Sequence, residues 1–79
     1  MSGHDNILRK HSIVISGHQT SITLENIFWD QLKAIAQSRG ISLSILVTQI
    51  DVHRISDDAN VNLSSAIRVF VLKSRLEDF

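Results

Sequence analysis

The sequence predicts a mostly helical domain in which one N-terminal strand is followed by two helices and an additional C-terminal helix. Three observations lead to this fold class. Polar and apolar residues alternate over 19–24, as in a half-buried strand, and two amphipathic segments divided by Gly40 follow. A further apolar stripe extends over 63–76. Because the chain offers no good second strand, we expect its strand to pair with that of a second copy.

The length and composition also favour a partner chain. At 79 residues the chain is one domain, which we place at 11–79 behind a flexible N-terminal arm at 1–10. A domain of this size buries only ~60% of its unfolded surface, yet 43% of the residues are hydrophobic. There is no cysteine, which excludes disulfides and thiolate metal sites.

Targeting signals and charge narrow the function classes. No apolar run approaches the ~18 residues of a membrane span, and the first ten residues lack the apolar core of a signal peptide. We therefore expect a cytoplasmic protein that contacts no membrane. The net charge of zero argues mildly against nucleic-acid binding. Arg9 and Lys10 nevertheless make the first 24 residues slightly basic, and a dimer would gather two such segments.

The strand has one apolar and one polar face. Its two sets of alternating side chains are Thr20, Ile22 and Leu24 on one side and Gln19, Ser21 and Thr23 on the other. Before Gly17, residues 11–16 are also β-branched, but Val14 breaks their alternation. They fit an extension of the strand, a second short strand or an arm crossing a neighbour. A local hairpin at Gly17 and His18 is a further possibility, although that turn dipeptide is not favoured.

The helices are predicted from apolar spacing and from capping residues. The first is expected at about 25–39, with Gly40 as its left-handed cap. The second follows Ser42, a good N-cap, and ends near 54–56. Asn62 can cap the third, which we expect at about 62–76. The second and third helices carry extra apolar stripes, which suits packing against more than one partner.

Two large side chains inside helices have structural interpretations. Trp29 lies one residue off the main stripe, and we expect it to pack in the core or at an interface. Arg68 lies within the apolar third helix, where we expect an ion pair with a carboxylate such as Asp51 across the dimer.

Four segments of the chain together resemble the ribbon-helix-helix domain, in particular a group of short bacterial proteins. The segments are the strand TSITLE, the pair Phe28–Trp29, the turn GISLS and the terminal NLSSAIRVFVL. The resemblance covers about residues 11–76 and implies an intertwined homodimer in which each chain donates one strand to a ribbon. The shared dimer core would contain Ile22, Leu24, Phe28, Trp29, Leu32, Ile35, Leu46, Val47 and Ile50.

The resemblance also implies which residues meet DNA. A two-stranded ribbon fits the major groove, and the base-contacting residues would be Gln19, Ser21 and Thr23. Relatives often carry a basic residue at one of these positions, and this chain does not. The phosphates would be held by backbone amides at a helix N-terminus, with help from the basic arm. The corresponding residues are Ser42, Leu43 and Ser44 in the helix, with Arg9, Lys10 and His18 before it.

Other chemistry has little support. His4, His11 and His18 are seven residues apart and do not show metal-ligand spacing, so we expect no metal. We also expect no cofactor and no small-molecule ligand. A phosphate-cradling glycine loop, a nucleophile elbow and cysteine are all missing, so we do not expect an enzyme.

The sequence therefore predicts a repressor-like transcriptional regulator that binds specific double-stranded DNA as a homodimer. An alternative is a module for oligomerisation or protein interaction that does not bind DNA, such as an antitoxin-like adaptor. The apolar stripes also leave open a higher oligomer joined through the C-terminal helix.

Overall fold

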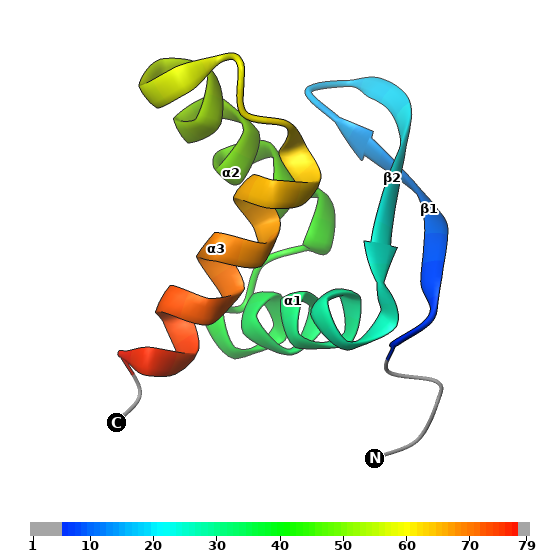
Figure 1. Cartoon of the computed structure of the whole chain (residues 1–79), viewed down its shortest axis with the longest axis vertical. Coiled ribbons are helices and arrows are strands. Elements are labelled where there is room, and N and C mark those ends of the chain that lie inside the picture. The colour runs from blue at the N-terminus through cyan, green and yellow to red at the C-terminus, as the bar shows by residue number, and fades with distance from the viewer. Residues whose placement is uncertain (1–5, 78–79) are drawn as a thin grey trace.

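The computed structural model describes residues 6–77 and shows a two-stranded antiparallel sheet followed by three helices (Figure 1). In chain order the elements are β1 (Leu8–Ile15), β2 (His18–Glu25), α1 (Asn26–Arg39), α2 (Leu43–Asp58) and α3 (Leu63–Leu76). The helices lie against one face of the sheet, and the other face is open. None of the helices within residues 6–77 has the length and apolar character needed to cross a membrane.

The expectation that the chain lacks a second strand is wrong. β1 pairs with β2 along its whole length, from Leu8 opposite Glu25 to Ile15 opposite His18. The turn between them is Ser16–Gly17, with φ angles of 52° and 81°. Positive φ at both central positions is the type I′ geometry, whose twist suits a two-residue hairpin. The ribbon is therefore complete within one chain, and residues 11–15 belong to a second strand.

The boundary of the expected arm also differs. β1 begins at Leu8, so the segment expected to be an arm at 1–10 is strand over its last three residues. Residues 1–5 lie outside the described residues. Val14, the apolar residue that breaks the alternation of this segment in the sequence, is 43% exposed on the open face of the sheet. Burial therefore alternates from His11 to Ile15, and Val14 is an apolar residue on the solvent side.

Three predicted capping residues lie at helix ends as expected. Gly40 adopts the left-handed conformation after α1, with φ of 69°. The Ser42 hydroxyl accepts the Ile45 N–H at 3.1 Å, and the Asn62 side chain accepts the Ser65 N–H at 2.8 Å. These three capping predictions are confirmed.

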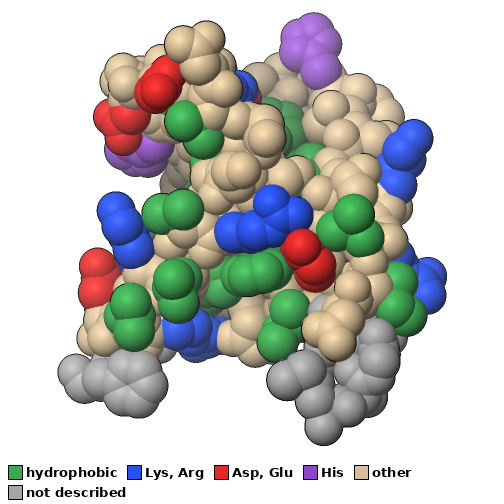
Figure 2. All heavy atoms as spheres, viewed as in Figure 1, with side chains coloured by type: hydrophobic (Ala, Val, Ile, Leu, Met, Phe, Trp, Pro, Cys, Tyr) green, Lys and Arg blue, Asp and Glu red, His purple; other side chains and the backbone are tan. Residues whose placement is uncertain are grey.

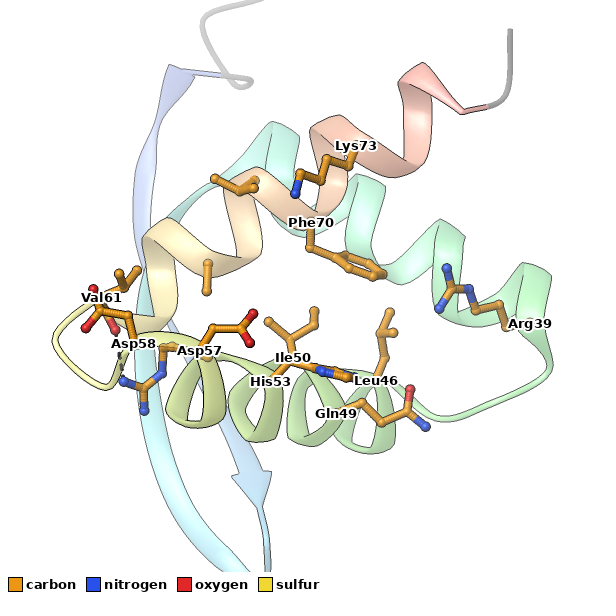
Figure 3. Close-up of a pocket in the computed structure, with 13 residues that line it drawn as sticks. Arg39, Leu46, Gln49, Ile50, His53, Asp57, Asp58, Val61, Phe70 and Lys73 are labelled. Carbon is orange, nitrogen blue, oxygen red and sulfur yellow. Dashed lines mark hydrogen bonds between the residues drawn. The ribbon is translucent and has the colours of Figure 1, made fainter.

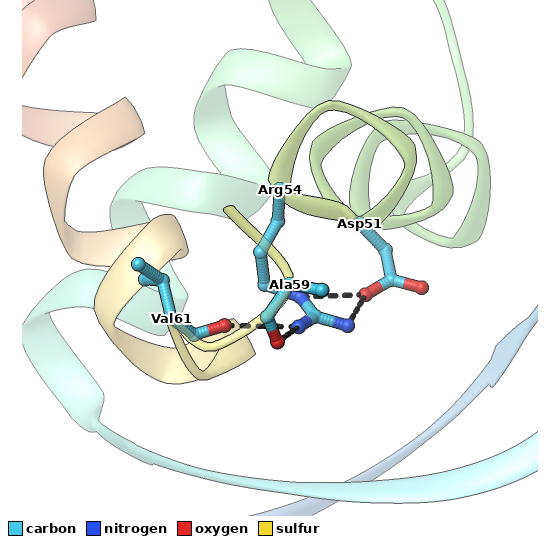
Figure 4. A network of polar contacts seen from close by, with 4 residues as sticks. All are labelled: Asp51, Arg54, Ala59 and Val61. Atoms are coloured by element: carbon cyan, nitrogen blue, oxygen red, sulfur yellow. Dashed lines mark hydrogen bonds and ion pairs between the residues drawn. The ribbon is translucent and has the colours of Figure 1, made fainter. Parts of the chain in front are cut away.

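α2 is longer than expected and ends at Asp58 instead of near 54–56. The side chain of Arg54 holds the last turn of α2 in place (Figure 4). The guanidinium donates to Asp51 Oδ1 at 2.7 and 3.0 Å and to the carbonyls of Ala59 and Val61 at 3.3 and 2.9 Å. Arg54 thereby ties the end of α2 to the connection that leads into α3.

A single hydrophobic core lies between the sheet and the helices. Leu24, Leu32 and Val47 have no exposed surface at all. Most residues expected in the dimer core are enclosed by their own chain, and Phe28 and Trp29 pack against that core while partly exposed. Their burial needs no second copy, so a role for them between two chains stays a prediction.

Arg68 forms an ion pair, but with a different residue from the one expected. Its Nε lies 2.8 Å from Oε1 of Glu25, at the end of β2. The expected partner, Asp51, is bound by Arg54 on the same helix. The Arg68–Glu25 pair lies within one chain and joins α3 to the sheet.

Candidate nucleic-acid interface

The open face of the hairpin carries all three predicted base-contacting residues. Gln19, Ser21 and Thr23 are exposed, as the period of two along a strand requires. Residues that face each other across an antiparallel pair share one side of the sheet. The pairing therefore adds three exposed β1 residues to the same face, namely Val14, Ser12 and Lys10. We call these six residues the outer ribbon face.

The outer ribbon face contains the basic residue that the β2 sequence lacks. Lys10 is directly opposite Thr23, a position at which Cβ atoms lie ~5 Å apart. An ammonium group there can reach guanine acceptors or a phosphate. The other two predicted cations lie elsewhere, since Arg9 faces Leu24 and His18 faces Ile15 on the opposite side of the sheet. The structure thus separates Lys10 from Arg9 and His18.

The first turn of α2 lies at the β1 edge of this face. The Ser44 hydroxyl donates to the Val14 carbonyl, and the Ser16 N–H donates to Thr48 Oγ1 at 3.3 Å. Val14 is the cross-strand partner of Gln19. The predicted phosphate-contacting turn and the predicted base-contacting strand are therefore one strand apart.

The backbone amides at this turn suit an anion. The Leu46 N–H bonds to the Ser42 carbonyl, and the Ile45 N–H is taken by the Ser42 side chain. The amides of Leu43 and Ser44 precede the first intrahelical bond, so helix geometry gives them no acceptor within α2. No acidic residue lies in the first turn to oppose the positive end of the helix dipole.

The β2 edge of the ribbon is held in a matching way. The Ser64 hydroxyl donates to the Thr23 carbonyl at 2.8 Å. Ser64 is the second residue of α3, as Ser44 is the second residue of α2. Each edge of the hairpin is therefore bound by a serine at the start of a helix, and the outer ribbon face has a fixed orientation on the helical layer.

His11 lies on the inner side of the sheet and has a structural environment. Its ring stacks on Trp29 with centroids 4.1 Å apart. Within residues 6–77 its buried Nε2 has no hydrogen-bond partner. Burial lowers the pKa of His11, and the nearby charges of Lys33 and Arg9 lower it further. The folded chain therefore favours a neutral imidazole, which is not a group for contacting phosphate.

Ser12 and Val14 share the outer ribbon face with Gln19 and Ser21, and the sequence pattern did not predict this. The pairing of these residues depends on the position of the turn. Only a turn at Ser16–Gly17 places them opposite each other. The sequence pattern also predicted no role for Ser64, because its partner Thr23 lies 41 residues away in the chain.

A family model described as the ribbon-helix-helix domain matches residues 8–74. No curated protein and no solved structure matches the chain. The matched span begins at the first residue of β1 and includes β2, α1, α2 and most of α3. Both strands of the hairpin therefore lie within the span that the family model describes.

Proposed function

The chain belongs to the ribbon-helix-helix domain family, and from this premise we propose that it is a homodimeric transcriptional regulator that binds operator DNA. Members of this family are typically non-enzymatic DNA-binding regulators or antitoxins that dimerise. The observation that carries the proposal is the outer ribbon face. It combines the three polar residues of β2 with Lys10 of β1, and it is open to solvent.

The ribbon would enter the major groove with this face toward the base edges. A two-stranded ribbon has the width that the groove of ~12 Å admits. Gln19 can bond adenine in a bidentate way, and Ser21 and Thr23 can donate to or accept from several bases. Lys10 supplies the single positive charge of the face, suited to guanine or to a flanking phosphate.

The start of α2 would hold a phosphate beside the ribbon. Its amides at Leu43 and Ser44 lack intrahelical acceptors, and the dipole favours an anion there. Because few cationic side chains lie near the outer ribbon face, few counterions would be released on binding. The logarithm of affinity falls with the logarithm of salt by about 0.9 per neutralised phosphate. We therefore expect a shallow salt dependence for this chain.

A two-fold homodimer would present two ribbons to two half-sites. Each copy would read its half-site with its own hairpin, because β1 and β2 of one chain already pair with each other. Dimer symmetry would then be mirrored in an operator with two related half-sites.

The proposal can be examined with genomic fragments, including the promoter region of the protein's own gene. Labelled fragments are titrated with the full chain at several salt concentrations, and binding is followed by fluorescence anisotropy. Gln19→Ala and Ser21→Ala should weaken binding to the selected fragment more than to unrelated DNA. Lys10→Ala should also reduce the salt slope by about 1 if Lys10 contacts a phosphate.

Lys33→Ala provides a matched control. Lys33 is an exposed cation on α1, outside the outer ribbon face. Its removal should leave both the affinity and the salt slope nearly unchanged. The absence of binding to every fragment at low salt would contradict the proposal.

A second candidate is an interaction module that does not bind DNA. The observation that favours it is a set of exposed apolar side chains on the outer sides of α2 and α3. These are Ile45, Val52 and Ile55 on α2 and Val69, Leu72 and Leu76 on α3. Selective binding to a fragment, lost in Gln19→Ala, supports the regulator over this candidate.

A further inference from the structure

A groove of about 480 Å³ lies between α2 and α3 (Figure 3). Its floor is apolar and is formed by Leu46 and Ile50 of α2 together with Ala66 and Phe70 of α3. Its lining residues come from the three helices and from the connection between α2 and α3, away from the hairpin (Figure 1). Sites for small molecules are typically apolar clefts of ~300–1,000 Å³. The groove has this size and lining, and it is separate from the outer ribbon face.

One end of the groove is basic. Arg39, the last residue of α1, lies over the Phe70 ring, with its guanidinium carbon 5.2 Å from the ring centroid. Lys73 follows Phe70 by three residues on α3 and also lines the groove. Among the described residues, neither cation has a partner in an ion pair. Two such cations beside an aromatic ring suit the carboxylate of a ligand, because a guanidinium can bind both carboxylate oxygens at once.

The other end of the groove is acidic. Asp57 and Asp58 lie there, in the last turn of α2 (Figure 3). Within residues 6–77, no cation binds either carboxylate. Arg54 also lines the groove, but Asp51 balances its charge. Eleven residues of α2 separate Asp57 from Leu46 of the floor, which is about 16 Å. A second anionic group on a long ligand would therefore meet repulsion at this end.

We propose that the groove binds a small amphipathic monocarboxylate, with its carboxylate at Arg39 and Lys73 and its apolar body along the floor toward Asp57. A chain of twelve carbons suits this length, since it spans about 13 Å when three bonds span ~3.6 Å. No small-molecule ligand is expected from the sequence alone, because only the fold brings the three helices together. The site goes beyond the proposed function and needs no DNA for its test.

The charges at the two ends determine which anions the groove accepts. A dicarboxylate with the same carbon chain would bring its second carboxylate close to Asp57 and Asp58. Salt screens charges only over ~8 Å at physiological ionic strength, so that repulsion persists at close range. Acetate has the carboxylate but lacks a body that could cover the apolar floor. The groove should therefore prefer a long monocarboxylate to both of these anions.

Calorimetric titration of the full chain with dodecanoate, dodecanedioate and acetate tests the site. All three probes are used below the concentration at which dodecanoate forms micelles. We expect saturable binding of one dodecanoate per chain, at least tenfold weaker binding of dodecanedioate and no measurable binding of acetate. A chain that does not bind dodecanoate, or that binds dodecanedioate equally well, would overturn the inference.

A double variant removes the basic end of the groove. Arg39→Gln with Lys73→Gln keeps two long polar side chains at exposed positions, so circular dichroism should show a folded protein. Its affinity for dodecanoate should fall at least tenfold. Lys33→Gln is the matched control, because Lys33 is an exposed cation of α1 outside the groove. Equal losses in the control and in the double variant would mean that the site is not at Arg39 and Lys73.

A second double variant, Asp57→Asn with Asp58→Asn, tests the acidic end. It should raise the affinity for dodecanedioate at least tenfold and change that for dodecanoate less than threefold. Asp58 Oδ1 accepts the Asn60 N–H at 3.0 Å, and asparagine keeps an oxygen for this bond. The turn after α2 should therefore be retained. An unchanged affinity for dodecanedioate would show that its second carboxylate does not face this end, against the proposed orientation.

The outer side of α3 provides a control for adsorption on exposed apolar surface. Figure 2 shows hydrophobic side chains gathered over the lower half of the view, where α3 runs. Leu72 is 57% exposed and lies outside the groove, so Leu72→Gln should leave the affinity for dodecanoate unchanged. Ala66→Leu adds volume to the groove floor and should weaken binding at least fivefold. Weaker binding in Leu72→Gln with unchanged binding in Ala66→Leu would place dodecanoate outside the groove and overturn the inference.

Discussion

His11 stacks on Trp29, with ring centroids 4.1 Å apart and ring planes inclined by 12°. The imidazole comes from β1 and the indole from α1, so this contact joins the hairpin to the helical layer. Burial is the largest influence on the pKa of His11 and lowers it, while a backbone hydrogen bond with Leu24 acts in the opposite direction. The fold therefore favours the neutral ring and opposes its protonation.

We predict that the chain loses stability as the pH falls below about 6.5. The unfolded chain takes up a proton on His11 near its ordinary pKa of 6.5. The folded chain takes it up only at lower pH, so acid favours unfolding between the two pKa values, and this loss levels off below the folded pKa. Urea unfolding at pH 7.5, 6.5 and 5.5 measures the effect through the fluorescence of Trp29, the sole tryptophan.

Two variants isolate this effect. His11→Phe keeps an aromatic ring against Trp29 but cannot titrate, so the stability change over this pH range should shrink. His18→Gln removes an exposed histidine beside the turn. This variant should show the same change in stability between pH 7.5 and 5.5 as the wild type. An unchanged pH dependence in His11→Phe would mean that another group is responsible.

The helices could be predicted because their signals are local. The caps at Gly40, Ser42 and Asn62 act within one turn of the chain, and the apolar spacing needs no knowledge of the partner element. The hairpin could not be predicted in the same way. Its turn places Ser16 at positive φ, a conformation that a residue other than glycine rarely adopts.

The candidate site was predictable only in part, because strand register decides which residues meet. Alternation alone places Gln19, Ser21 and Thr23 on one face. Lys10 comes opposite Thr23 only because the turn is Ser16–Gly17. A turn one residue later would place Ser12 there instead. Contacts over long sequence separations, such as Arg68 with Glu25, leave no local signal at all.

The turn offers a prediction of its own. Replacing Ser16 by asparagine should raise the free energy of unfolding by up to ~1 kcal/mol, because asparagine tolerates the left-handed region better. Gly17→Ala should lower it by ~1–2 kcal/mol. An added Cβ at Gly17 would have no heavy atom within 4 Å, so that cost is purely conformational. Thermal unfolding of both variants measures the two changes in stability. Equal shifts in the same direction would contradict the turn geometry.

The ion pair of Glu25 with Arg68 predicts a response to acid. The Arg68 guanidinium lowers the pKa of Glu25 below its usual value of 4.5. Stability from this pair is therefore present above pH 4.5 and is lost as the pH falls through the folded pKa. Because both side chains are about one-third exposed, Glu25→Gln should cost less than ~1 kcal/mol at pH 7. The cost should be smaller at pH 3 than at pH 7 in urea unfolding.

Asp30→Asn is the matched control for that experiment. Asp30 lies 3.6 Å from Lys33, and both side chains are half exposed. Water screens an ion pair this exposed, so Asp30→Asn should cost less stability than Glu25→Gln at pH 7. If Asp30→Asn and Glu25→Gln lose stability equally, the Arg68 contact has no special contribution.

Ser64 is predicted to hold the β2 edge of the ribbon. Its hydroxyl donates to the Thr23 carbonyl at 2.8 Å, and Ser64→Ala should lower the free energy of unfolding by ~1 kcal/mol. Because this hydrogen bond ends on Thr23 in β2, its loss should also increase amide hydrogen exchange along β2 more than along α1. Amide hydrogen exchange measured by NMR on the full chain gives the rates in β2 and α1, and urea unfolding gives the free energy of unfolding.

Ser65→Ala makes the same chemical change one residue later. The Ser65 backbone is bound to the Asn62 side chain, and that bond survives the substitution. Exchange in β2 should therefore stay as in the wild type. Ser64 joins β2 of the ribbon to α3. Ser64→Ala should therefore also weaken binding to the selected DNA fragment, whereas Ser65→Ala should not. Equal DNA affinities for the two variants would show that the orientation of β2 does not depend on Ser64.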